Sequence, residues 1–167
     1  MLKNLRIITF LVSINAIADY QITVLATNIS NYGGFGEWSF SALYESDKES
    51  ILFDTGFHED TVLHNASILG KDLSRVNKVV LSHFHSDHTG GLIKLRKTYK
   101  ELNENAFSEV YVARGFFDQR FYKDGSKEGP GNFKDSSRFR RVAEEEGIKF
   151  IILDEHKMIS ENLYATG

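Results

Sequence analysis

Cysteine is absent from the 167-residue sequence, which excludes disulfide bonds and thiolate metal sites. Basic runs are absent too: 20 Lys and Arg against 23 Asp and Glu give a formal net charge of −3. A nucleic-acid-binding surface is therefore not indicated, because such surfaces are strongly basic. No run reaches the roughly 20 apolar residues that span a bilayer. A content of 41% hydrophobic and 26% charged residues is typical of one soluble globular domain.

The N-terminus has the three regions of a secretory signal peptide. Two basic residues precede the apolar run Ile7–Ile14, and Ala16-Ile17-Ala18 follows with small residues at the cleavage positions. We predict that residues 1–18 are a signal peptide, that residues 19–167 form the mature domain, and that the protein is secreted or periplasmic. The alternative is a cytoplasmic protein in which this run is a first buried strand or helix.

One short stretch holds four side chains that bind metals, His83, His85, Asp87 and His88. It follows an apolar run and precedes the pair Gly90-Gly91, as in a turn from strand to helix. Imidazoles at positions i and i+2 point the same way on an extended chain, and the later two side chains reach a neighbouring position once the chain turns. Histidines also occur as surface or core residues, but three of the chain's six in one turn are hard to explain that way.

This layout suits two adjacent cations better than one. Imidazole and carboxylate ligands together favour Zn²⁺, with Fe and Mn as the alternatives. The stretch also carries a resemblance, because His83-x-His85-x-Asp87-His88 resembles the metal motif of the metallo-β-lactamase superfamily of hydrolases. Asp54-Thr55-Gly56, at the end of an apolar run, is similar to an Asp that the superfamily carries at an earlier strand end.

A longer run is similar to the dihydropterin-phosphate (methanopterin-type) synthase-like branch of that superfamily. The matching segments are Leu52–Gly56, Asn65-Ala66 and Leu81–Leu92, and the likeness extends over about residues 21–167. The resemblance implies an α/β fold, an αβ/βα sandwich of two similar halves, of which this chain supplies about the first. The chain thus resembles an N-terminal part or a truncated form, and the remaining zinc ligands belong to the second half. We expect the 167 residues alone to bind zinc weakly and to hydrolyse little.

The resemblance also implies roles for single residues. His83 and His85 would hold the first metal, and Asp87 and His88 the second. Asp87 is the candidate catalytic residue, which would orient the attacking hydroxide or carry its proton. Asp54 would hydrogen-bond near the ligands and fix their orientation; its alternative role is to cap the turn before Gly56.

The implied activity is cleavage of an ester, phosphoester, amide or thioester by metal-bound hydroxide, with a small molecule, anionic or phosphate-bearing, as substrate. The alternative is a catalytically inactive, truncated metal-binding or interaction protein. Oligomeric state is not predicted.

Three further histidines and two loops are weaker candidates. His58 is interpreted as a solvated loop residue, His64 as a helix-surface residue, and His156 as an improbable third ligand. The loop Asn31–Trp38, with three glycines and three aromatic residues, suits a mobile flap or an ordinary solvated loop. The polar loop Asp124–Ser136 is flanked by or contains Lys123, Lys127 and Lys134, which would meet an anionic group or remain solvated.

Residue patterns predict a hairpin-like antiparallel start followed by alternating strands and helices, hence a mixed α/β sheet. The predicted strands are Gln21–Thr27, Trp38–Glu45, Ser50–Phe53, Lys78–Ser82, Glu109–Ala113, Ile148–Leu153, Lys157–Ile159 and Asn162–Ala165. The predicted helices are Glu59–Leu69, Gly91–Leu102, Phe116–Tyr122 and Ser137–Glu146.

Overall fold

The computed structural model describes residues 20–118, 121, 123–126, 136–161 and 163–166. The predicted signal segment 1–18 lies outside these residues, as do Lys127, Lys134 and Asn162. The strands are β1 (Gln21–Ala26), β2 (Ser41–Glu45), β3 (Ser50–Phe53), β4 (Val76–Leu81), β5 (Glu109–Ala113), β6 (Lys149–Leu153), β7 (Lys157–Ser160) and β8 (Leu163–Ala165). The helices are α1 (Thr61–Ile68), the 3₁₀ turn η1 (Leu73–Arg75), α2 (Ser86–Thr89), α3 (Leu92–Tyr99) and α4 (Ser136–Glu145).

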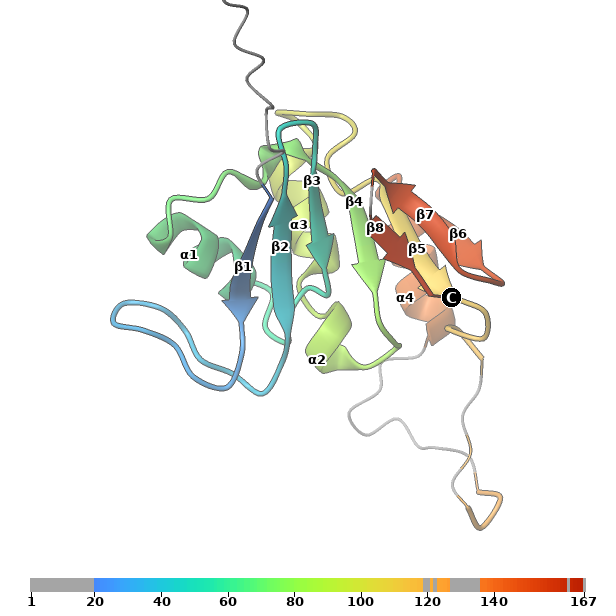
Figure 1. The fold of residues 1–167 in the computed structure, drawn as a ribbon. Coiled ribbons are helices and arrows are strands. Elements are labelled where there is room, and N and C mark those ends of the chain that lie inside the picture. Colours follow the sequence, from blue (N-terminus) through green and yellow to red (C-terminus); the bar gives the residue numbers. More distant parts are fainter. Residues whose placement is uncertain (1–19, 119–120, 122, 127–135, 162, 167) are drawn as a thin grey trace, which may run out of the picture.

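A six-stranded mixed sheet runs through the molecule in the order β1-β2-β3-β4-β5-β6 (Figure 1). The β1–β2 and β2–β3 pairs are antiparallel, whereas β3 to β6 are parallel to one another. Parallel neighbours need crossover connections, which helices commonly provide. Because β3 and β4 are parallel, the segments after Phe53 and after Leu81 leave the sheet at the same edge. The predicted mixed α/β sheet is confirmed.

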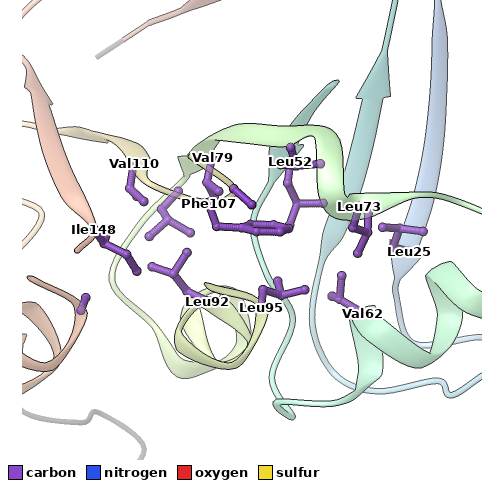
Figure 2. Close-up of a cluster of buried hydrophobic side chains, with 14 of the residues drawn as sticks. Leu25, Leu52, Val62, Leu73, Val79, Leu92, Leu95, Phe107, Val110 and Ile148 are labelled. Atoms are coloured by element: carbon purple, nitrogen blue, oxygen red, sulfur yellow. The ribbon is translucent and has the colours of Figure 1, made fainter. Parts of the chain in front are cut away.

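Helices α1, α3 and α4 cover one face of this sheet (Figure 1). Each helix buries apolar residues three or four positions apart, which fall on one side of a helix. These residues are Val62 and Ala66 on α1, Leu92 and Leu95 on α3, and Phe139 and Ala143 on α4. Figure 2 shows Leu92 and Leu95 lying opposite Leu52, Val79 and Val110 of the sheet. This core holds fixed the strand ends that carry the metal motif. In the part of the chain that the structure describes, no helix has the length and hydropathy to cross a membrane.

The hairpin β7–β8 packs on the opposite face, where Ile159 joins Tyr111 and Leu153 in a small buried cluster. Lys78 joins the hairpin to the sheet, because the Lys78 Nζ donates to Glu49 Oε2 and to the Ile159 carbonyl, each at 2.8 Å. Between the hairpin and β2–β3 lies a mostly apolar cavity of about 390 Å³.

The elements differ from the prediction in three places. Of the helix predicted over Phe116–Tyr122, residues 119, 120 and 122 lie outside the described part, and residues 116–118 belong to a turn over 114–118, where Gly115 has a φ of +77°. Phe116 and Phe117 instead pack edge-on at 5.0 Å, so their apolar spacing reflects an aromatic cluster and not a helix. The strand predicted from Trp38 begins at Ser41. The short helix α2, within the metal motif itself, was not predicted.

Candidate functional site

The four candidate ligands and Asp54 lie at the edge of the sheet where β3 and β4 end. Asp54 directly follows β3, and Ser82 and His83 follow β4. His85 is still extended, with φ −133° and ψ 150°, and α2 starts at the next residue. This turn brings His88 back toward His83, with ring centroids 4.2 Å apart. The His83 and His85 rings are 4.3 Å apart. The motif thus lies at a strand end, as predicted, and the turn of helix within it is an addition to the prediction.

The segment after Asp54 is hydrogen-bonded along its backbone to the metal motif. Thr55 N–H donates to the His88 carbonyl at 2.8 Å, and Gly90 N–H donates to the Gly56 carbonyl at 2.9 Å. The approach is so close that a Cβ on Gly90 would lie 1.8 Å from the Phe57 carbonyl oxygen. The glycines after the motif are therefore required by the backbone contact, which locks the two loops into one unit.

Asp54 is buried, with 1% exposure, and binds the motif through both carboxylate oxygens. Oδ1 accepts from Ser82 N–H at 2.8 Å, while Oδ2 accepts from Ser82 Oγ at 2.8 Å and from His88 Nδ1 at 2.7 Å. Burial raises the pKa of the Asp54 carboxyl, and the hydrogen bonds from Ser82 and His88 oppose that rise. Asp54 also has a φ of +51°, a conformation in which Asp is tolerated better than most residues. Asp54 therefore both forms the turn after β3 and holds the His88 ring by a hydrogen bond.

The donors around His88 fit a divalent metal ion. Nδ1 of the ring is hydrogen-bonded to Asp54 Oδ2, and the other nitrogen, Nε2, lies 3.4 Å from Asp87 Oδ2. Two donors bound tetrahedrally at about 2.1 Å from one zinc ion lie roughly 3.4 Å apart. Within the described residues, however, no three His, Asp or Glu side chains are grouped so as to hold one ion. The described motif offers paired donors, and a zinc ion there needs further ligands.

Among the weaker histidine candidates, His64 has contacts of another kind. His64, on α1, stacks on Phe35 at 3.8 Å and its Nε2 contacts the Gly33 carbonyl at 2.7 Å. It therefore connects the loop Asn31–Trp38, here called the glycine-rich loop, to α1. Asn65 does the same, since its Oδ1 accepts from Phe35 N–H at 2.8 Å. His58 and His156 are exposed, and so is Lys123, the one described lysine of the three near the polar loop.

Glu37 is a polar anchor that the sequence analysis missed. Its Oε1 accepts from Ser39 Oγ at 2.6 Å and from Phe57 N–H at 2.7 Å, and its Oε2 accepts from His58 N–H at 3.1 Å and Thr61 Oγ1 at 2.8 Å. It thus binds the glycine-rich loop to the segment that follows Asp54. Burial alone would raise the pKa of Glu37, but these four hydrogen bonds hold it below the ordinary value. No spacing in the sequence predicts the contact between Glu37 and Phe57, which are 20 positions apart.

We expect wild type to lose more stability than Glu37→Gln as the pH falls. The pKa of Glu37 is lower in the folded than in the unfolded chain, whose value is about 4.5. Its stabilisation is therefore complete above that unfolded pKa and disappears as pH falls through the folded pKa. Urea unfolding of both proteins between pH 7 and pH 3 measures the difference in free energy of unfolding. A gap between the two proteins that stays constant over this range would contradict the assignment.

Comparison with known proteins identifies the family. Residues 39–153 match the model of the metallo-β-lactamase superfamily, so the chain belongs to that superfamily. Its fold resembles the crystal structure of Tm1679, a metal-dependent hydrolase of the β-lactamase superfamily, with a TM-score of 0.60 and 29% identity. That match covers 89% of this chain and 48% of Tm1679.

Two curated relatives come from Methanocaldococcus jannaschii. One is 7,8-dihydropterin-6-methyl-4-(β-D-ribofuranosyl)-aminobenzene-5′-phosphate synthase, 31% identical over 100 residues, with 56% of this chain and 33% of the relative covered. The other is an uncharacterized protein, 35% identical over 72 residues, with 43% of this chain and 28% of the relative covered. The chain spans about a third of the length of these relatives. The resemblance to the methanopterin-type branch is confirmed.

Proposed function

We propose that this chain is the metal-binding part of a metal-dependent hydrolase. The observation that carries the proposal is the cluster at the ends of β3 and β4, in which Asp54 holds His88 while its Nε2 lies 3.4 Å from Asp87 Oδ2. Superfamily membership and the likeness to a metal-dependent hydrolase support it.

In this proposal His83 and His85 bind one zinc ion, and Asp87 and His88 bind a second. A bound divalent ion supplies Lewis acidity and acidifies the attacking water. The remaining work falls to the chain's own residues. In this proposal Asp87, whose side chain is 20% exposed, orients that water and accepts its proton. Asp54 is too deeply buried to reach a substrate, and it keeps the His88 ring in place.

The proposed substrate is a small molecule with a hydrolysable ester, phosphoester, amide or thioester, and an anionic group. The relative that is a synthase of a 5′-phosphate compound supports the phosphate-bearing class. Fold alone does not choose among these reactions, because one fold supports many chemistries.

The test uses the full-length protein, as its gene encodes it. Zinc content is measured after dialysis, and turnover is measured with a generic phosphodiester, a thioester and a β-lactam. Retained zinc with chelator-sensitive turnover of any probe supports the hydrolase. Retained zinc without turnover of any probe supports the alternative, a non-catalytic metal-binding protein, and absence of zinc binding overturns both.

Asp54→Asn is expected to weaken zinc binding roughly 10- to 100-fold, as is usual when a group that orients a metal ligand is removed. Asn tolerates the positive φ of this position, and its amide oxygen can still accept from Ser82 N–H. Its amide nitrogen, however, is a donor where Oδ2 accepts from His88. Competition with a chromophoric chelator measures the dissociation constant. An unchanged constant in a folded variant would leave Asp54 as a turn residue only.

A further inference from the structure

The hydroxyl of Ser82 connects side chains that the proposed function assigns to different metal ions. Its Oγ lies 2.8 Å from Asp54 Oδ2, 3.0 Å from His83 Nδ1 and 3.4 Å from His88 Nδ1. His83 belongs to the first proposed pair of ligands, and His88 to the second. Neither the motif resemblance nor the comparisons assign a role to this serine.

The positions of the protons follow from what each group can donate. An ionised carboxylate only accepts hydrogen bonds, so the single hydroxyl proton of Ser82 is directed to Asp54. With that proton engaged, Ser82 Oγ is an acceptor toward His83, which must then carry its proton on Nδ1. His88 likewise donates from Nδ1 to Asp54. In both rings the unprotonated nitrogen is consequently Nε2, and only an unprotonated ring nitrogen can bind a metal ion.

We propose that Ser82 is a positioning residue that selects the Nδ1–H tautomer of His83, and that Asp54 reaches this ligand only through the Ser82 hydroxyl. The inference rests on the proposed function, since it concerns which ring nitrogen of each metal ligand carries the proton. The Asp54 carboxylate then sets the tautomer of one ligand in each pair, that of His88 directly and that of His83 through the Ser82 hydroxyl. Hydrogen bonds on the far ring nitrogen commonly set the tautomer of a ligating histidine in this way.

Ser82 is exposed, so removing its hydroxyl leaves no cavity in the core. Ser82→Ala is thus expected to fold, and Ser82→Thr keeps a hydroxyl at the same position. Ser108→Ala is a matched control, because the Ser108 hydroxyl donates to the Asn105 carbonyl and to no residue of the motif.

The experiment records nitrogen-15 NMR spectra of the imidazoles in metal-free protein, about two pH units above the ordinary imidazole pKa of about 6.5. In wild type and Ser82→Thr, His83 and His88 are expected to show the Nδ1–H pattern. In Ser82→Ala, His83 is expected to become a mixture of tautomers while His88 keeps its pattern. Zinc affinity, measured by chelator competition, is expected to fall roughly tenfold in Ser82→Ala and to recover in Ser82→Thr.

Wild-type His83 in the Nε2–H tautomer would overturn the inference without any variant. So would a Ser82→Ala protein whose His83 tautomer and zinc affinity are those of wild type. These outcomes are independent of turnover. A protein with the expected tautomers that neither retains zinc nor hydrolyses any probe would contradict the proposed function while leaving the role of Ser82 intact.

Discussion

Replacing Asp87 with Asn in the full-length protein is expected to lower turnover by at least about 100-fold, the usual lower limit for losing a general acid or base. The proposed role of Asp87 is twofold, since its carboxylate would bind the second zinc with His88 and would accept a proton from the attacking water. Asn keeps the shape of the side chain but has no negative charge and cannot serve as a base. Both proposed contributions are lost in one step.

The variant is expected to remain folded, because the Asp87 side chain is partly exposed and its ion contact with His88 Nε2 is long, at 3.4 Å. Asp60→Asn is a suitable control: Asp60 is exposed, and its Oδ1 lies 3.7 Å from the Nζ of Lys94, which is not a residue of the motif. Turnover of the best probe, zinc content and the melting temperature are measured for each protein. If Asp87→Asn kept wild-type turnover with bound zinc, Asp87 would have no catalytic role.

Regular patterns made most of the fold predictable from the sequence. The bounds of β3 and β5 agree with the prediction, and α1 and α3 were found because their buried residues recur at helical spacing. Gly70 and Gly147 follow the ends of α1 and α4, and both take the positive φ that suits glycine after a helix. The pattern failed at Phe116, where apolar spacing came from an aromatic cluster. Packing between distant residues decided that segment, and periodicity does not report it.

In the candidate site, too, some residues could be predicted from the sequence and others could not. Its motif and Asp54 were recognisable because chemistry requires those residue types near one another along the chain. Ser82 and Glu37 were not, since their importance arises from contacts that only the folded chain brings together. The loop Asn31–Trp38 is a further example: the sequence left a mobile flap and an ordinary solvated loop both open, and it did not predict the contacts of Phe35 with Asn65 and His64 on α1.

Gly90→Ala is expected to destabilise the protein by about 3 kcal/mol, a large value for overpacking by one methyl group. Helix propensity alone predicts that Gly90→Ala would stabilise the protein. Gly90 has helical angles, φ −61° and ψ −37°, where Ala is ordinarily favoured over Gly by about 1 kcal/mol. The new Cβ would lie 1.8 Å from the Phe57 carbonyl oxygen and 2.9 Å from the Ser86 carbonyl oxygen, and backbone atoms cannot rotate away as a side chain would. The motif and the segment after Asp54 must therefore separate.

Thermal and urea unfolding of Gly90→Ala measure the loss, which corresponds to a fall in melting temperature of about 10 °C for a chain of this size. Gly70→Ala separates the collision from ordinary backbone strain. Gly70 has a φ of +64° and no atom within 4 Å of its added Cβ, so its substitution costs only the left-handed conformation, about 1–2 kcal/mol. Gly90→Ala should cost more than this control and should also weaken zinc binding, because separating the loops breaks the 2.7 Å contact between Asp54 and His88. A Gly90→Ala protein as stable as wild type would show that the two loops are not locked together by this contact.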